Sequence, residues 1–449
     1  MPTEPTLPLL DVEPLPPLAD AAPAEIAEHL RERGVRFLRL YHSDLRGTLS
    51  LGEVPVRRAE EVLRDGLPIE RTLREGLGID ETALRLRPDL ATLHLLPYLE
   101  GPRPSAAVLC DLQRADGTPY EGDPRHCLRR VTEALAADGW RLRIAAEVEF
   151  FLLQPLVPPS PTPRLPGCQA AETARLAIVE ALEAIGLEVD ALSDGDAPGQ
   201  HRLRLAAADA LAAADQLALF RTTAREVAER HGLLLTLMPK PFAARHGCGL
   251  HLHHALYRGE ANVFWDAALP DALPEVLRAY VGGLLRHARG YTVVTNPLVN
   301  SYKRLVPGFA APVAVAWGMQ NHSALVRVPT PRGPASGCEV RLADAAANAY
   351  LAIAVQAAAG LDGVRRELEP GEPVNKPVGS MSPREQRRLG VERLPRGLGE
   401  ALPLLDEARL IRATLGEYLY AQFREQRRAE WRDYRDQVHA WELEQYLAG

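Results

Sequence analysis

Residues 145–153 limit what this chain can fold into more than any other stretch. They are apolar except for Glu147 and Glu149, which predicts a mostly buried β-strand. Side chains two positions apart on a strand point to the same face, so the two carboxylates lie side by side. Neighbouring carboxylates resist burial unless a cation lies against them, and a divalent metal ion is the usual cation. The alternative is a strand with one face in solvent, which the adjacent Phe150 and Phe151 disfavour.

Composition excludes several classes of protein. The 449 residues are enough for two domains with a large core. The net charge is -7, and basic and acidic residues are interspersed, without the basic stripe of a nucleic-acid-binding protein. The five cysteines have no C-x-x-C spacing, which indicates small buried thiols in a reducing compartment. No apolar run reaches the ~18 residues of a membrane span, and the N-terminus does not resemble a signal peptide. We therefore expect a cytoplasmic protein that binds neither nucleic acid nor membranes.

The pattern of elements predicts a tail and two domains. Residues 1–23 are Pro-rich and are expected to be a flexible tail. Residues 24–117 are expected to form a small α+β domain in which strands surround one helix. Residues 118–449 are expected to form a larger domain with a curved, mostly antiparallel sheet, flanking helices and a site on the concave face. The expected strands of the small domain are 35–41, 49–56, 91–96 and 106–112, and its helix is 24–33.

The larger domain begins with a clear helix start, because Asp123 precedes Pro124 in the order that favours an N-cap and a first helical residue. Residues 155–166 are Pro-rich and are expected to be a loop. The other expected helices are 170–185, 208–230, 274–287, 345–359 and about 416–446, and the expected strands are 141–153, 201–205, 233–238 and 249–256.

Three further segments carry candidate site residues. His251 and His253 share one face of a predicted strand, although such a pair is often only a satisfied polar residue. Glu339 and Arg341 project an acid and a base together in the same way. One imidazole and two carboxylates around an ion suit magnesium or manganese better than zinc. Residues 300–308 place two cations before a Pro-Gly turn, which either clamps an anion or is a solvated basic turn.

From about Val35 to Tyr446 the chain resembles the type I glutamine synthetase family, because several of that family's signatures occur in order. The matching segments are CD, GTP and DPR within 110–125, MPKP at 238–241, GCGLHLH at 247–253, NSYKRLVPG at 300–308, AW at 316–317, EVR at 339–341, ANAYLA at 347–352 and AWE at 440–442. The resemblance implies a β-grasp-like N-terminal domain followed by a glutamine synthetase-type catalytic domain. It also implies a double hexameric ring with sites shared between neighbouring subunits. The implied reaction is ATP-driven phosphorylation of the side-chain carboxylate of glutamate, followed by attack of ammonia or an amine.

The resemblance also implies roles for individual residues. Glu147, His251 and Glu339 resemble the site whose Mg²⁺ or Mn²⁺ orients the ATP phosphates, and Glu149 resembles a ligand of a second metal nearer glutamate. The other implied roles are a nucleotide-phosphate contact for His253, a phosphate-facing arginine for Arg327, the glutamate-carboxylate pair for Arg304 and Arg341, the glutamate pocket for Gly247, and for Asp44 the aspartate that a neighbouring subunit contributes to the amine site.

The chain departs from the family pattern at the second metal. Where the family has two more carboxylates, this chain has Gly195 and Arg202. One remaining carboxylate is a poor divalent site, so we expect the Arg202 guanidinium to lie against Glu149 and to replace the ion with a fixed positive charge. Asp194 and Asp196 are alternative ligands, but the register of the strand disfavours them.

Other departures affect the reaction itself. Ala310 stands where the family has a glutamate that closes the site and takes a proton from ammonium, and losing a general base typically costs ~10²–10⁴-fold in rate. His322 and Gly337 replace two phosphate-side arginines, and His246 replaces an asparagine of the glutamate pocket. Three hypotheses follow. The protein is a ligase acting on an amine other than ammonium, or an ATP-binding regulatory or structural paralogue without turnover, or, least consistent with these residues, an ordinary glutamine synthetase.

Overall fold

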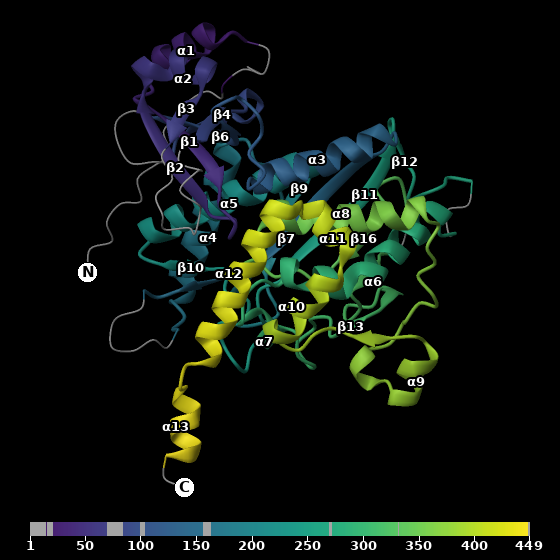
Figure 1. Ribbon diagram of the computed structural model, residues 1–449. Helices are drawn as coiled ribbons and strands as arrows, with labels where there is room; N and C mark the ends of the chain where they lie inside the picture. The colour runs from purple at the N-terminus through teal and green to yellow at the C-terminus, as the bar shows by residue number, and fades with distance from the viewer. Residues whose placement is uncertain are drawn as a thin grey trace.

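The computed structural model describes residues 15, 21–69, 84–98, 104–155, 163–268, 272–330 and 332–447. Most of the predicted tail and the greater part of the predicted loop at 155–166 lie outside these residues. Figure 1 shows a small layer of sheet and helices at the N-terminal end beside a larger body. In the same view the C-terminal helix α13 projects away from that body (Figure 1). Within the described residues, no helix is both long and apolar enough to cross a membrane.

The small sheet has the strand order β2-β1-β6-β4-β3, and β5 also pairs with β6. β1 and β6 run parallel, and the other pairs are antiparallel. Its strands are β1 (Phe37–Ser43), β2 (Leu49–Pro55), β3 (Leu67–Ile69), β4 (Leu84–Pro88), β5 (His94–Leu96) and β6 (Ser105–Arg114), and its helices are α1 (Pro23–Glu32) and α2 (Ala59–Asp65).

Two expectations for this part were wrong. A second helix, α2, is present because Ala59, Val62 and Leu63 recur at helical spacing and are buried. The expected strand at 91–96 begins only at His94, since Leu90–Thr92 forms a 3₁₀ turn that Asp89 caps through a hydrogen bond from the Ala91 N–H.

The two faces of β6 contribute to two different cores. Ala106 and Val108 pack with α1 and α2, whereas Ala107 and Leu109 on the opposite face join the larger core. Because successive side chains of a strand point to opposite faces, β6 contributes side chains to the cores of both parts of the molecule. The boundary expected between residues 117 and 118 stays a prediction.

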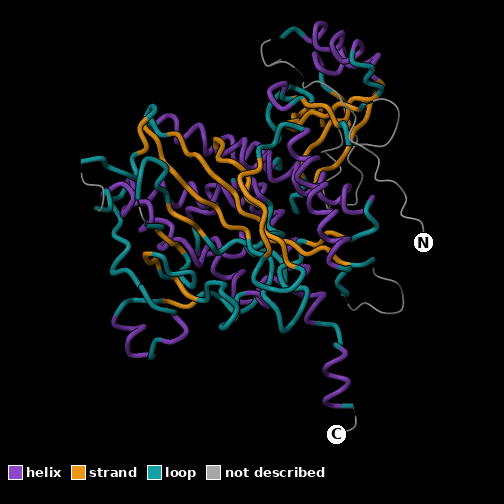
Figure 2. The backbone as a smooth tube through the Cα atoms, turned by 180° about the vertical axis from the view of Figure 1, so that it is seen from behind, coloured by secondary structure: helices purple, strands orange, loops and turns teal. Residues whose placement is uncertain are grey.

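The large sheet has the order β14-β15-β16-β11-β7-β9-β8, with β10 on β7 and β12 on β11. Only β14 and β15 pair in parallel, so the predicted curved, mostly antiparallel sheet is confirmed (Figure 2). The strands are β7 (Arg141–Leu153), β8 (Val189–Asp194), β9 (Gln200–Asp209), β10 (Leu234–Thr236), β11 (Leu250–Arg258), β12 (Ala261–Asn262), β14 (Trp317–Met319), β15 (Val326–Val328) and β16 (Cys338–Val340); β13 (Ala314–Val315) pairs separately with β17 (Glu392–Arg393).

Helices cover the apolar face of this sheet, where Phe150 of β7 meets Phe220 of α5 with ring centroids 5.9 Å apart. The helices of this part are α3 (Pro124–Ala137), α4 (Cys168–Ala184), α5 (Ala210–Arg230), α6 (Glu275–Thr295), α7 (Ser301–Arg304), α8 (Ala349–Arg365), α9 (Pro383–Arg388), α10 (Leu398–Glu407), α11 (Arg409–Leu415), α12 (Glu417–Arg435) and α13 (Ala440–Tyr446).

Several of these boundaries differ from the predicted ones. α6 continues to Thr295 because its last turns are buried. The single C-terminal helix expected from 416 to 446 is wrong, since α12 ends at Arg435 and α13 restarts beyond His439, whose N–H donates to Glu442. Four cysteines are buried as expected, but Cys168 is exposed at the start of α4.

The turn between β1 and β2 docks the small sheet onto the start of α8. Asn348 Nδ2 donates to the Asp44 carbonyl at 2.9 Å. Gly47 has a φ of +76°, and a Cβ there would lie 2.9 Å from the Asn348 Cα and 2.8 Å from Arg221 Nη1. The close approach of these segments therefore requires glycine at position 47.

We expect Gly47→Ala to lower the free energy of unfolding by about 2–4 kcal/mol, because it adds left-handed strain to overpacking against backbone. Gly117→Ala is the matched control, since Gly117 has a φ of +85° with nothing near its missing Cβ, and it should cost only the strain, about 1–2 kcal/mol. Urea unfolding of both variants measures the difference. Equal losses would contradict the docking contact.

Candidate active site

The candidate metal ligands, together with His253, Arg327 and Arg202, gather on one face of five neighbouring strands. β7 carries Glu147 and Glu149 and pairs with β9 on one side and with β11 on the other. His251 of β11 lies directly opposite Glu147. His253 lies opposite Glu339 of β16, which in turn lies opposite Arg327 of β15. The alternate residues of β7 form the core on the other face. Pairing through β11 thus brings together Glu147 and Glu339, which are 192 residues apart in the chain.

His251 lies between two carboxylates. Its Nδ1 is 3.1 Å from Glu147 Oε1 and 3.3 Å from Glu339 Oε1. Burial alone raises the pKa of Glu147, but the hydrogen bond to His251 and the charges of His251 and Arg202 outweigh it and bring that pKa to about 2. The three donors that the sequence suggested for one ion therefore lie together, with ionised carboxylates.

Glu339 is fully buried and is neutralised by two arginines. Arg327 Nε donates to one carboxylate oxygen, and Arg341 Nη1 donates to the other. Burial opposes ionisation, but His251 and Arg341 hold the pKa of Glu339 far below its usual range. Arg341 also donates through Nε to the His322 carbonyl at 3.0 Å.

Arg304, Glu149 and His251 meet at the backbone of Gly249. A Cβ on Gly249 would lie 2.7 Å from Arg304 Nη2, 2.9 Å from His251 Nε2 and 3.1 Å from Glu149 Oε2. Arg304 is buried and donates to the carbonyls of Leu342 and Arg341 at 3.0 and 3.2 Å. The candidate carboxylate-binding arginines are therefore adjacent to the candidate metal ligands.

Gly247 and Asp44 occupy different surroundings. The Gly247 carbonyl accepts a hydrogen bond from Gln200 Nε2 at 2.9 Å, and Gly247 lies close to the side chain of Arg304. The Asp44 carboxylate accepts the N–H groups of Arg46 and Thr48 at 2.9 and 2.8 Å and so holds its own turn. A contribution of Asp44 to a neighbouring subunit stays a prediction.

His253 and Arg327 line a cavity of about 800 Å³. Burial lowers the pKa of His253 to about 4, and its Nε2 is buried without a hydrogen-bond partner among the residues that the structure describes. A neutral imidazole with an unsatisfied nitrogen beside an open cavity is suited to contact a ligand oxygen. Both residues thus line the same cavity, and their contact with a nucleotide phosphate stays a prediction.

Sequence reasoning missed three other arginines of this cavity, namely Arg143, Arg204 and Arg332. The available signal was again the period of two, because Arg143 lies four residues before Glu147 on β7 and Arg204 lies two residues after Arg202 on β9. Buried nitrogens of Arg332 also have no hydrogen-bond partner within the described residues.

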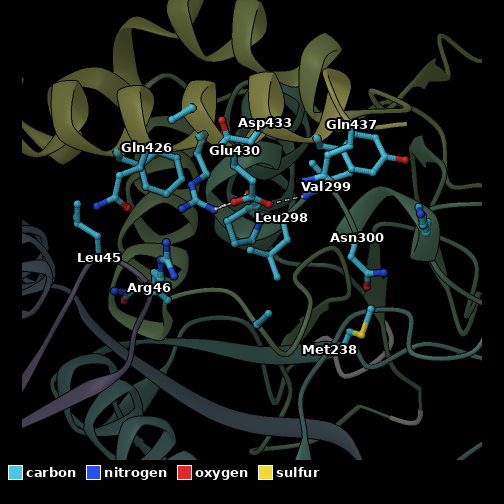
Figure 3. A pocket seen from close by; sticks show the side chains of 18 residues that line it. Leu45, Arg46, Met238, Leu298, Val299, Asn300, Gln426, Glu430, Asp433 and Gln437 are labelled. Carbon is cyan, nitrogen blue, oxygen red and sulfur yellow. Dashed lines mark hydrogen bonds and ion pairs between the residues drawn. The ribbon is translucent and has the colours of Figure 1, made fainter. Parts of the chain in front are cut away.

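A second cavity, of about 860 Å³, lies between the loop before α7 and helix α12. In Figure 3 Glu430 of α12 points toward Val299, whose N–H donates to Glu430 Oε1 at 2.9 Å. This cavity is larger, but of the predicted site segments only residues 300–308 reach it, through Asn300 and Lys303. The candidate metal ligands and His253 lie elsewhere, so the chemistry of the site points to the arginine-rich cavity instead.

The loop after Pro307 brings an aromatic ring, not an acid, to the edge of the site. Phe309 covers Lys240 Nζ at 3.3 Å from its ring centroid and meets the His246 ring edge-on at 5.7 Å. Ala310 is exposed with a φ of +56°. Burial, assisted by the charge of Arg304, lowers the pKa of Lys240, a residue to which sequence reasoning gave no role.

Arg202 lies where the sequence predicted it. Its Nη2 is 2.9 Å from Glu149 Oε1, and its Nε is 3.3 Å from Glu147 Oε1. The other oxygen of Glu149 accepts the Gly249 N–H at 2.7 Å. The expected contact of Arg202 with Glu149 is therefore confirmed, whereas the replacement of a second ion stays a prediction.

These contacts decide which ion the residues fit. Among the described residues, no group of three His, Cys, Asp or Glu side chains has the geometry to hold a metal ion as it stands. At this site, arginines bond to the carboxylates. The group of Glu147, His251 and Glu339 still has the donor chemistry and convergence that magnesium or manganese requires. The position beside Glu149 does not fit an ion, since Arg202 fills it.

Comparison with known proteins agrees with this architecture. Residues 121–446 match the model of the glutamine synthetase catalytic domain. The glutamine synthetase of Thermus thermophilus is 40% identical over 443 residues, covering 95% of this chain and 98% of the relative, and that of Staphylococcus aureus strain MW2 is 38% identical over 434 residues, covering 94% and 97%. A solved structure described as a GmaS/ADP complex has a TM-score of 0.83 and 31% identity, covering 94% of this chain and 99% of the GmaS chain.

The fold is therefore that of an ATP-dependent ligase class whose members use divalent metal ions. The chain belongs to the glutamine synthetase family.

Proposed function

We propose that this protein is an ATP-dependent ligase that joins the side-chain carboxylate of glutamate to an amine other than ammonium. The observation that carries the proposal is the convergence of Glu147, His251 and Glu339 at the edge of a cavity lined by His253 and Arg327. Acidic ion ligands beside phosphate-binding groups are what phosphoryl transfer requires. A structural neighbour is described as a GmaS complex with ADP, which supports a nucleotide in this cavity.

In this proposal, each site residue has the role that its position allows. Arg304 and Arg341 hold the carboxylates of glutamate, with the Gly247 backbone at the pocket wall, and His253 and Arg327 contact the nucleotide phosphates. Glu147, His251 and Glu339 hold Mg²⁺ or Mn²⁺, which neutralises phosphate charge when bound. The γ-phosphoryl group of ATP passes to a side-chain carboxylate oxygen of glutamate and leaves ADP. The amine nitrogen then attacks the acyl carbon, phosphate leaves, and the nitrogen loses a proton.

The preference for another amine rests on the loop after Pro307. Ala310 cannot take a proton from ammonium, and an amine that is already neutral at pH 7 needs no such base before it attacks. Phe309 and His246 present aromatic surface next to this position, which favours an amine larger than ammonia. The implied double hexameric ring, with Asp44 contributed to a neighbouring site, belongs to the same proposal.

A second candidate is an ATP-binding paralogue without turnover. The observation that favours it is that arginines bond to the carboxylates of all three glutamates of the site. Such a protein would bind nucleotide through the arginine-lined cavity and would act on an active synthetase in mixed rings.

Phosphate release from purified protein with ATP, magnesium, glutamate and a panel of amines distinguishes the candidates. Turnover with a bulky or weakly basic amine and little with ammonium supports the ligase. ATP binding without turnover on any amine supports the paralogue. Efficient ammonium-dependent turnover contradicts both.

We expect Ala310→Glu to raise ammonium-dependent phosphate release by at least about tenfold, because it restores a carboxylate where a proton must be taken up, a function worth ~10²–10⁴-fold in rate when optimally placed. Ala310 already carries a Cβ at positive φ, so the substitution adds little new strain. Ala310→Gln is the matched control, since it has the same size without the base. Equal rates for the two variants would contradict the role of position 310.

A further inference from the structure

We infer that the active site works with a single divalent ion per subunit, and that Arg202 is a built-in cation occupying the place of a second. This inference rests on the proposed function for the first ion and deepens it. Arg202 lies on the same face as Glu147 and Glu149 because β9 pairs with β7 in a register that places it opposite Glu149. The guanidinium is therefore positioned by the sheet itself.

The contacts of Glu149 leave no place for an ion. One carboxylate oxygen bonds to Arg202 Nη2 at 2.9 Å, and the other accepts the Gly249 N–H at 2.7 Å. Glu149 is buried, with only 8% of its side chain exposed. A divalent ion needs several oxygen ligands at 2.0–2.6 Å, and the Arg202 guanidinium occupies the space that such ligands would have to enclose.

The neighbouring turn between β8 and β9 excludes a replacement ligand. A Cβ at Gly195 would lie 2.6 Å from Gln200 Cγ, and Gln200 is buried and held by hydrogen bonds to the Gly247 carbonyl and the Ala197 N–H. No side chain fits at position 195 unless Gln200 moves. The sequence shows the glycine, but only the structure shows that the space beside it is filled.

The two aspartates beside Gly195, Asp194 and Asp196, already form ion pairs with arginines. Asp194 is 82% exposed and pairs with Arg175 at 3.1 Å. Asp196 pairs with Arg202 Nη2 at 3.2 Å, so it holds the guanidinium in place and does not replace it. Arg202 thus has contacts with three carboxylates, those of Glu147, Glu149 and Asp196. Its fixed charge can neutralise these acids without the entry or loss of an ion.

Counting bound Mn²⁺ tests the inference without any turnover. Full-length protein is titrated with Mn²⁺ alone, and free Mn²⁺ is followed by electron paramagnetic resonance. We expect Arg202→Glu, which puts a carboxylate opposite Glu149, to bind one more Mn²⁺ per subunit than the wild type. Arg36→Glu is the matched control, because it makes the same charge change at an exposed position directly before β1 of the small sheet and should bind as many ions as the wild type.

Arg202→Ala provides a second variant if Arg202→Glu does not fold. It vacates the position, so added Mn²⁺ should raise its melting temperature more than that of the wild type. Equal ion numbers for wild type and Arg202→Glu, or equal thermal shifts for wild type and Arg202→Ala, would overturn the inference. Failure of the proposed function has a different signature, since a wild type that binds one Mn²⁺ per subunit but releases no phosphate with any amine contradicts the ligase and not the inference.

Discussion

Arg125→Met is expected to lower the free energy of unfolding by about 3–5 kcal/mol, the usual cost of removing one partner from a buried ion pair. Arg125 is 2% exposed and makes two parallel bonds to Asp215, at 2.9 and 2.8 Å. It also donates to Asp111 and Asp89 at 2.6 and 2.7 Å, and Tyr350 donates to Asp215. Methionine fills the volume but leaves these carboxylates without their cation.

The position of this cluster explains why the loss should be large. Asp111 lies on β6 of the small sheet, Arg125 on α3 and Asp215 on α5, so one guanidinium connects both parts of the molecule. Urea unfolding of the full-length protein, followed by tryptophan fluorescence, gives the change in unfolding free energy. Arg64→Met is the control, because Arg64 pairs with Asp65 on the surface and its removal should change little. Adding Asp215→Leu should restore part of the loss, and a single variant no less stable than the Arg64 control would contradict the argument.

The second large effect is expected at Glu339, where Glu339→Gln should reduce ATP-dependent turnover at least about 100-fold. In the proposed function Glu339 helps to hold an ion that is worth several kcal/mol of charge stabilisation, and each 1.4 kcal/mol is about tenfold in rate. Glutamine keeps the shape of the side chain but removes the charge that faces His251, Arg327 and Arg341. The same substitution should weaken Mn²⁺ binding by more than the 10–100-fold typical of residues that only support a ligand.

Phosphate release at saturating ATP and Mn²⁺ titration measure these two effects separately. Glu385→Gln is a suitable control, since Glu385 forms an ion pair with Lys376 away from the site and should change neither quantity. If Glu339→Gln kept wild-type Mn²⁺ affinity, the assignment of Glu339 as an ion ligand would be wrong even if turnover fell.

The sequence alone determined those features that depend on local periodicity. The bounds of β7 are those predicted, because an apolar run with acids two apart has one good secondary structure. The N-cap of α3 followed from Asp123 and Pro124 for the same local reason. The contact of Arg202 with Glu149 could also be expected. The family resemblance predicts that position 202 lies opposite Glu149, and β9 does pair with β7 in this register.

Tertiary structure decided what local periodicity cannot encode. Helix α6 extends to Thr295 because burial against other helices stabilises its last turns, and the small helix α2 exists because the sheet beneath it buries its apolar residues. The arginines of the cavity at His253 come from β7, β9 and β15 and from the segment before β16, and no single segment shows that they converge. Likewise, only the structure shows that Gln200 fills the space beside Gly195 and so leaves no room for a ligand side chain there. A residue's own sequence neighbours fix the face on which its side chain lies, whereas long-range strand pairing and packing fix what that face meets.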